Sequence, residues 1–129
     1  MAKEVKAKLS NLRIAPRKVR LIGDLIRGKS VLMAKAQLTF VNKKAAPILL
    51  KLLNSATANA KNNFNLNEEN LYLKKVLVDG GASLKRWRPV WKGMAHPIMK
   101  RTSHITLVLD EYKNDKHKDK DKISNQAKA

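Results

Sequence analysis

The sequence predicts an α+β domain, in which three helices pack on a three-stranded antiparallel sheet and one long β-hairpin protrudes beyond both. Helical periodicity is confined to residues 16–61, whereas apolar and polar residues alternate in residues 5–9 and again from residue 71 onward. Segments 71–85 and 98–112 are equal in length and lie symmetrically about a common centre. The two periods predict the mixed fold class, and the symmetry predicts the hairpin.

Two short helices are expected ahead of a longer one. Pro16 is tolerated in a first helical turn and Gly28 is a typical stop, so the first helix is expected between them. Ser30 can cap the second helix, because its hydroxyl can accept a hydrogen bond from an amide of the first turn. The expected apolar stripes consist of Val19, Ile22, Leu25 and Ile26 in the first helix and of Val31, Ala34 and Leu38 in the second.

The third helix is the longest and is expected over about residues 43–61, with Asn42 as a candidate cap. Pro47 removes one amide donor near the first turn, so the regular helix is expected to begin a few residues late. The asparagine-rich residues 62–67 are expected to form a loop. The buried face should consist of residues that recur at three- and four-residue steps, namely Ala46, Leu49, Leu50, Leu53, Ala56 and Ala60.

Positive charge is the dominant feature of the composition. The chain has 129 residues, a net charge of +18 and no cysteine, and only +3 of that charge lies in residues 113–129. This length has room for one core but not for a separate catalytic module. We expect a single domain over residues 1–112, with its hairpin at about 80–104, and then a basic disordered tail. Such an excess of charge indicates a polyanion partner, and no apolar run is long enough to span a membrane.

The outer half of the hairpin carries the residues that indicate a function. Residues 85–101 contain six basic side chains and no acid, and both tryptophans, Trp87 and Trp91, lie in the same stretch. A two-stranded ribbon is marginal in water unless another layer packs on it, so something outside the chain should support this segment. Phosphates would neutralise the cations, and the indoles could stack on unpaired bases or pack on the opposite arm. A basic ribbon inserted into folded RNA is therefore favoured.

An architectural DNA-binding protein with a basic β-ribbon arm is the alternative. Such proteins insert an apolar wedge at the ribbon tip, and Pro89 could serve as that wedge. They are generally symmetric dimers, however, and no dimerisation face stands out in the sequence. We therefore expect no homo-oligomer, and preference for duplex DNA over folded RNA would decide between the two functions.

An enzyme is not expected. His96, His104 and His117 are scattered without a metal-binding spacing, so no metal is expected. The adjacent carboxylates of residues 68–69 lie in a polar loop, whereas acid–base catalysis needs groups that converge in a pocket. Residues 80–81 are two glycines without the longer pattern of a phosphate-binding loop, and they predict a strand irregularity or a close backbone approach. No cofactor is expected.

Five motifs of the chain resemble those of one known family. They occur in the family's order and together cover about residues 5–110, which makes the resemblance highly specific. The motifs are Lys18-Val-Arg-Leu-Ile-Gly-Asp-Leu-Ile-Arg-Gly28, Asn42-Lys-Lys-Ala-Ala46, Asn54-Ser-Ala-Thr-Ala-Asn59, Val78-Asp79 with Gly81, and Lys100-Arg-Thr-Ser-His-Ile-Thr106. On these residues the chain resembles the bacterial large-subunit ribosomal protein twenty-two family.

The resemblance implies both a location and a role. Members of the family have a small α/β domain near the mouth of the peptide exit tunnel and a long β-hairpin that threads through large-subunit ribosomal RNA. The hairpin tip forms part of the tunnel wall opposite a loop of ribosomal protein four, where it faces the nascent peptide. The implied role is structural: the protein would aid assembly of the large subunit in the cytoplasm and would perform no chemistry itself.

The resemblance also assigns expected roles to individual residues. One face of the first helix and the shaft of the hairpin are expected to lie against RNA. The tip departs from the usual family pattern, in which many relatives have Arg at the positions of Val90 and Met94 and a small residue at that of Trp91. The residues expected to bind ribosomal RNA are Arg17, Lys18, Arg20, Lys85, Arg86, Arg88, Lys92, Lys100, Arg101 and His104. The residues expected to line the tunnel are Arg88, Pro89, Val90, Trp91, Lys92, Gly93, Met94 and Ala95.

Overall fold

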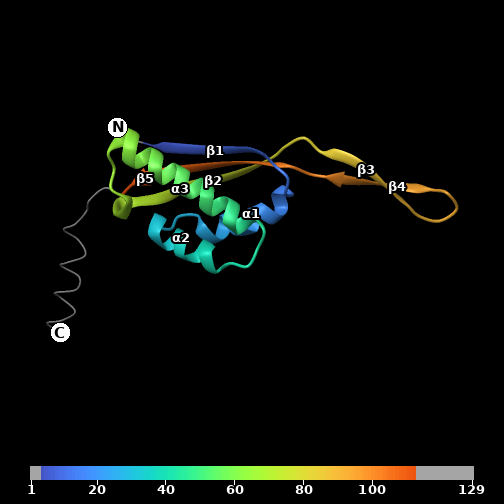
Figure 1. Cartoon of the computed structure of the whole chain (residues 1–129), viewed down its shortest axis with the longest axis horizontal. Helices are drawn as coiled ribbons and strands as arrows, with labels where there is room; N and C mark the ends of the chain where they lie inside the picture. Colours follow the sequence, from blue (N-terminus) through green and yellow to red (C-terminus); the bar gives the residue numbers. More distant parts are fainter. Residues whose placement is uncertain (1–3, 113–129) are drawn as a thin grey trace.

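A computed structural model of the chain describes residues 4–112, and the predicted tail over residues 113–129 lies outside the described part. Figure 1 shows helices gathered on one side of a sheet, and a narrow two-stranded ribbon that continues from the sheet to a point well beyond the helices. The α+β class is confirmed. In chain order the elements are β1 (Val5–Leu12), α1 (Pro16–Ile26), α2 (Val31–Phe40), α3 (Ala45–Phe64), the 3-10 helix η1 (Glu68–Asn70), β2 (Leu71–Gly80), β3 (Leu84–Pro89), β4 (Ala95–Lys100) and β5 (Ser103–Glu111).

The sheet has the strand order β1-β5-β2, and both pairs are antiparallel, as predicted. Leu107 lies near the middle of the central strand, where it pairs with Ala7 of β1 and with Val76 of β2. β1 runs past its predicted end to Leu12. This extension is irregular, because Asn11 has a φ of 56° and the register shifts before Leu12.

One face of the sheet is buried against the three helices. Ile105, Leu107 and Leu109 alternate along β5 and are fully buried, as the period of two requires. Removing such side chains from water is the main source of stability, at about 25 cal/mol per Å² of apolar surface. Leu25 was expected in this core but is 38% exposed. The helical residues of the core are Val19, Ile22, Ile26, Val31, Ala34, Leu38, Ala45, Ala46, Leu49, Leu52, Leu53, Ala56 and Ala60.

The first two helices begin as predicted. α1 starts at Pro16, and the chain leaves it through Gly28, whose φ of 78° suits a residue without a Cβ. The hydroxyl of Ser30 accepts a hydrogen bond from the amide of Met33 at 3.3 Å, which confirms the cap of α2.

α3 begins at Ala45, shortly after residue 43, as expected from Pro47, whereas its predicted end and its predicted cap are wrong. No side chain caps the helix, and Asn42 lies outside it; Pro47 stands in the first turn, where its missing amide disrupts no helical hydrogen bond. The helix continues to Phe64, which packs partly against the core, so part of the expected loop is helical. It ends at Asn65, which adopts the left-handed conformation, with a φ of 53°. Leu50 is only half-buried, because the core stripe turns toward residues 52–53.

The outer edge of β2 is covered by the end of α1 and the loop that follows it. That loop exchanges two backbone hydrogen bonds with Leu73, each of 2.9 Å. Arg27 donates to the carbonyl of Val76 at 2.8 Å, and Arg20 donates to that of Val78 at 3.1 Å. An open strand edge can pair with other chains, so these contacts protect β2 as well as fixing the orientation of α1.

Candidate nucleic-acid interface

The ribbon, which comprises β3, β4 and the loop between them (residues 84–100), has two faces of different character. Side chains at paired positions of an antiparallel ladder lie on the same face, so the register assigns every residue to one side. The first face carries most of the Lys and Arg side chains of the two strands, and apolar groups predominate on the second. The basic face carries Leu84, Arg86, Arg88, His96, Ile98 and Lys100, and the apolar face carries Lys85, Trp87, Pro89, Ala95, Pro97 and Met99.

The indole of Trp87 is the largest group on the apolar face. Its paired residue is Pro97, so the side chain lies beside the opposite arm, yet 66% of Trp87 is exposed. All of β3 is exposed, as is β4 except for the half-buried Ile98. The ribbon therefore presents both cations and an aromatic surface to its surroundings, and its own chain covers little of either.

A tight turn closes the tip of the ribbon. The amide of Val90 donates to the carbonyl of Met94 at 2.8 Å, and the amide of Met94 donates to the carbonyl of Trp91 at 3.0 Å. Lys92 and Gly93 both have positive φ, of 51° and 71°, which a glycine adopts without strain. The ammonium of Lys92 lies 4.9 Å from the ring centroid of Trp91, a cation–π contact in which the indole is 64% exposed.

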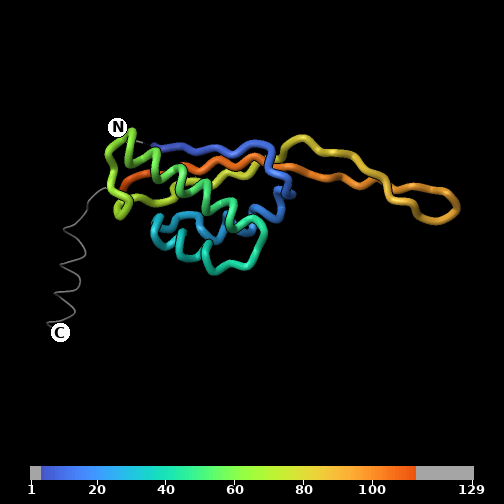
Figure 2. Tube along the Cα trace, in the orientation of Figure 1, coloured from blue at the N-terminus to red at the C-terminus, as the bar shows by residue number. Residues whose placement is uncertain are grey.

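An irregular hinge joins the ribbon to the sheet. Residues 81–83 of one arm oppose residues 101–102 of the other, so one arm carries an extra residue, and Figure 2 shows the arms diverging before they run together again. Gly81 donates its amide to the carbonyl of Thr102 at 2.8 Å, and the Thr102 hydroxyl donates to the carbonyl of Ala82 at 2.7 Å. A Cβ on Gly81 would lie 2.4 Å from that hydroxyl oxygen. The irregularity and close approach predicted at the two glycines are both confirmed.

His104 stands beside the hinge and has a partner within the chain. Its Nδ1 accepts the backbone amide of Asn11 at 3.0 Å, and its Nε2 would lie 3.1 Å from a Cβ on Gly81. The side chain is half-buried. His104 was expected to bind ribosomal RNA; in the structure its bond to the backbone of Asn11 holds the irregular part of β1 against β5.

A cleft of about 750 Å³ lies where the base of the ribbon meets the starts of α1 and α3. We call it the basal cleft. Its walls come from the segment before α1, the exposed side of α1, the segment before α3 and the last residues of β4. Leu21 and Met99 form part of its apolar surface and are 67% and 50% exposed. No acid lines it, and its basic residues are Arg13, Lys18, Lys43, Lys44, Lys100 and Arg101.

The acids of the described part gather at the opposite end of the body. Residues 4–112 contain seven acids, and five of them lie beside the outer end of the sheet, away from the ribbon (Figure 1). The strand register and the bond from the amide of Tyr112 to the carbonyl of Asn70 bring this end together. The five are Glu4, Glu68, Glu69, Asp110 and Glu111. The molecule is thus polarised, because the ribbon and the basal cleft together hold ten cations and no acid.

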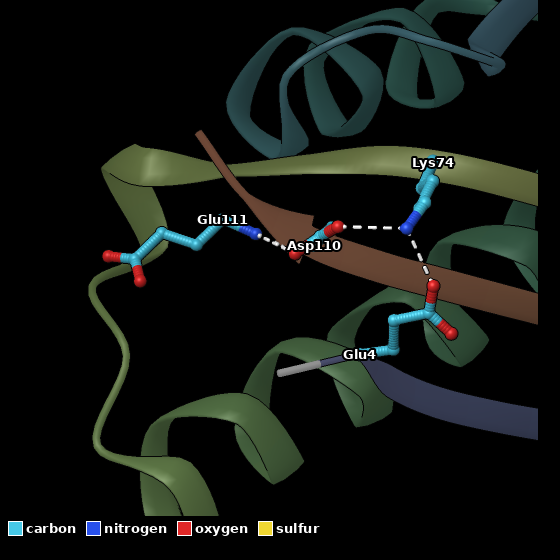
Figure 3. Close-up of polar contacts among 4 residues, drawn as sticks. All are labelled: Glu4, Lys74, Asp110 and Glu111. Atoms are coloured by element: carbon cyan, nitrogen blue, oxygen red, sulfur yellow. Dashed lines mark hydrogen bonds and ion pairs between the residues drawn. The ribbon is translucent and has the colours of Figure 1, made fainter. Parts of the chain in front are cut away.

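Lys74 connects the three strands at this acidic end (Figure 3). Its ammonium lies 2.6 Å from Glu4, just before β1, and 3.1 Å from Asp110 of β5. The hydrogen bond and charge of Lys74 lower the pKa of Glu4. The hydrogen bonds to Glu4 and Asp110 raise the pKa of Lys74 above the usual value for lysine. These groups satisfy one another, so this end offers no surplus charge to a polyanion.

The structure brings only some of the predicted binding residues together. Lys18, Lys100 and Arg101 meet in the basal cleft, and both ribbon arginines share a face with Lys100. Arg20 is instead turned to the edge of β2. Arg17 is exposed in the first turn of α1, and Lys85 stands on the apolar face.

Three cleft residues are absent from the predicted set: Arg13, Lys43 and Lys44. A signal for them is visible in the sequence, because each lies just before a helix begins. Acids and small polar caps are favoured at such positions, and cations are not.

These features define a small α+β protein with an exposed basic, partly aromatic ribbon and a basic cleft. The family model described as Ribosomal protein L22p/L17e matches residues 7–110. The chain therefore belongs to the ribosomal protein L22p/L17e family, and the resemblance seen in the motifs is confirmed.

Named relatives agree with the family model. The chain is 55% identical over 112 residues to the large ribosomal subunit protein uL22 of Phytoplasma sp. (strain STRAWB2), a match that covers 87% of each chain. It is 56% identical over 110 residues to the protein of the same name from Lactobacillus helveticus (strain DPC 4571), covering 85% of this chain and 93% of the relative.

The described residues contain neither a metal-binding cluster nor a membrane-spanning helix. Within residues 4–112, no three His, Cys, Asp or Glu side chains come together as a metal site requires. Among the helices of the same part of the chain, none is both long and apolar enough to cross a membrane.

Proposed function

We propose that the protein is a structural constituent of the large ribosomal subunit, in the cytoplasm, and that it binds large-subunit ribosomal RNA through its ribbon and basal cleft. Membership of the family supports a structural ribosomal role. The main support for RNA binding is the uneven distribution of charge over the molecule. The ribbon and the basal cleft contain cations and no acid, whereas five of the seven described acids lie at the other end. A ribbon so exposed needs an external partner to order it.

The proposed mechanism is positioning. Lys and Arg of the basic face displace counterions from RNA phosphates, so log affinity should fall with log salt concentration by about 0.7–0.9 per phosphate contact. A-form grooves hide base edges from side chains, so the shape of the RNA around the ribbon would supply most of the specificity. Bound in this way, the protein would hold separate RNA segments together and thereby aid subunit assembly.

We further propose that the tip, residues 88–95, lines the nascent-peptide exit tunnel and lies near ribosomal protein four. The support is the family resemblance, together with the position of this turn at the far end of the ribbon (Figure 1). A photoreactive label on a Met94→Cys variant should cross-link to nascent peptide in translating ribosomes, and one on Lys61→Cys should not. Equal labelling from the two positions, or none from position 94, would remove the tip from the tunnel.

Competition binding tests the choice between RNA and DNA. Tagged protein bound to large-subunit ribosomal RNA should resist an excess of duplex DNA, and in a cell lysate it should sediment with large subunits in both high and low magnesium. Preference for duplex DNA, or migration at the top of the gradient, would refute the ribosomal function. The architectural DNA-binding alternative would then take its place.

Charge reversal tests the hairpin shaft. Lys100→Glu with Arg101→Glu should weaken binding to ribosomal RNA by about tenfold or more, because two phosphate contacts become repulsive. The same change at Lys118 and Lys120, outside the described residues, should have a smaller effect. Lys51→Glu with Lys61→Glu provides a second control, since both lysines are exposed on α3. Equal losses in all three pairs would contradict the assignment of the shaft.

A further inference from the structure

The basal cleft contains a local electrostatic conflict. α1 and α3 both begin at the cleft: Ala15, the residue before α1, and Ala45, the first residue of α3, line it. A helix N-terminus carries a partial positive charge, and its first amides lack helical acceptors. Neither helix has an acid in its first turn or a side chain that caps it. Part of each first turn is satisfied within the chain, because the amides of Lys18 and Ala46 donate to the carbonyls of Ala15 and Lys43. No acidic or capping side chain, however, offsets the partial positive charge of either helix end in the cleft.

The basic side chains increase this conflict. Lys18 lies in the first turn of α1, and Lys43 and Lys44 directly precede α3, where charges of this sign are unfavourable. Lys100 and Arg101 add their charges from the ribbon side. Protein sequences usually follow the residue preferences of helix ends, and exceptions are expected mainly at functional sites. An anion would relieve the violation here, and helix N-termini bind phosphate groups particularly well.

The apolar part of the cleft indicates what accompanies the phosphate. Leu21 and Met99 are 67% and 50% exposed although basic groups surround them, and Ile98 lies beside them on the cleft wall. The volume of about 750 Å³ is within the usual range for sites that enclose a small molecule. A regular duplex presents a convex row of phosphates with its bases stacked inside, so it could not place a base in this concavity.

We propose that the basal cleft binds one unpaired, turned-out nucleotide of large-subunit ribosomal RNA. Its phosphate lies at the N-termini of α1 and α3, between Lys18, Lys43 and Lys44, and its base packs against Leu21, Ile98 and Met99. This inference rests on the proposed function and adds a specific mode of recognition to it. The ribbon reads the shape of the RNA, whereas the cleft requires a nucleotide that has left its stack at a fixed distance from the ribbon.

The phosphate part of the proposal is tested by charge reversal in the full chain. Lys43→Glu with Lys44→Glu should weaken binding to large-subunit ribosomal RNA about tenfold or more. It should also reduce the slope of log affinity against log salt by about 0.7–0.9, the value for one phosphate contact. Both residues are exposed, so folding should be retained. The matched control is Lys51→Glu with Lys61→Glu, which reverses two exposed lysines of α3 outside the cleft.

The base is located by cross-linking. The chain has no cysteine, so a Met99→Cys variant can carry a single aryl azide label, and Lys61→Cys serves as its control. After binding to large-subunit ribosomal RNA and irradiation, primer extension should stop at one nucleotide that is unpaired in the RNA. The control label should give no such stop. Replacing that nucleotide's segment by a continuous duplex should weaken binding of the wild-type chain and abolish the cross-link.

The outcomes separate this inference from the proposed function. If the wild-type chain fails to bind ribosomal RNA, the proposed function fails and the inference fails with it. If the wild-type chain binds but the Lys43 and Lys44 variant binds as tightly as its control, the function stands and the cleft site is overturned. Cross-links from position 99 only to paired nucleotides, or in assembled subunits only to an acidic protein segment, would also overturn it.

Discussion

The inner and outer halves of the long hairpin have the same antiparallel pairing but opposite environments. In the inner half, β2 and β5 belong to the body, and no residue of β5 is exposed. In the outer half, β3 and β4 pair along their full length, and every residue of β3 is exposed. The hinge at residues 81–83 and 101–102 is the boundary between the two halves.

The difference shows that the backbone hydrogen bonds of a hairpin do not by themselves determine its stability. The inner half gains free energy from apolar side chains buried under three helices, whereas the outer half buries almost nothing within the chain. An isolated two-stranded ribbon is marginal in water. We therefore expect the order of the outer half to depend on a partner that contacts its cations and indoles.

The largest expected contrast is in hydrogen exchange of the free protein. Amides of β3 and β4 should open at a cost of about 0 kcal/mol, whereas those at the centre of β5 should open only with global unfolding, at about 5–15 kcal/mol. Binding to ribosomal RNA should slow exchange in the ribbon and leave β5 unchanged. Strong protection of residues 84–100 without RNA would show that the ribbon is stable on its own, and the comparison would fail.

A pair of truncations tests the same contrast by stability. Leu107→Ala should lower the free energy of unfolding by about 2–5 kcal/mol, because it leaves a cavity under a fully buried side chain. Met99→Ala on the ribbon should change it by no more than about 0.5 kcal/mol, since half of that side chain is exposed. Urea denaturation measures both values. Similar losses would mean that the ribbon belongs to the cooperative core.

A third prediction concerns the hinge. Gly81→Ala should destabilise the protein by about 1–3 kcal/mol, because the new Cβ would lie 2.4 Å from the Thr102 hydroxyl and the side chain would have to move. Gly80→Ala is the matched control, since no atom lies within 4 Å of its Cβ position and its φ is not positive. Thermal unfolding of the two variants gives the comparison. Equal changes in unfolding temperature for the two variants would show that the close approach at Gly81 does not affect stability.

The smallest effect is expected at the acidic end of the sheet. Lys74 lowers the pKa of Glu4 in the folded state, so the unfolded state binds a proton more readily. The contribution of this pair to stability is therefore present above the unfolded pKa of glutamate, about 4.3, and is lost as pH falls through the folded value. Glu4→Gln should lower the unfolding midpoint slightly at pH 7 and hardly at all in strong acid. The exposed Glu69→Gln should show no such pH dependence.

Much of the fold can be read from periodicity because burial repeats with the geometry of each element. Periodicity predicted the strands and the first two helices. Residue type predicted the cap at Ser30 and the close approach at Gly81. The ends of α3 were not, because Phe64 gains burial that no local pattern reveals, and Asn65 then ends the helix in a left-handed conformation. Long-range packing decided those residues against local preference.

Some features of the candidate site could likewise be predicted from the sequence, and others depend on the tertiary structure. The cationic, acid-free composition of the ribbon is a property of the amino-acid order, and no tertiary contact is needed to see it. Tertiary structure alone turned Arg20 to the edge of β2 and joined His104 to Asn11. It also brought residues 13, 43–44 and 100–101 to one cleft, although they are far apart along the chain. The physical reason is that composition sets the total charge, whereas the packing of two helix ends against the base of a ribbon sets where that charge becomes concentrated.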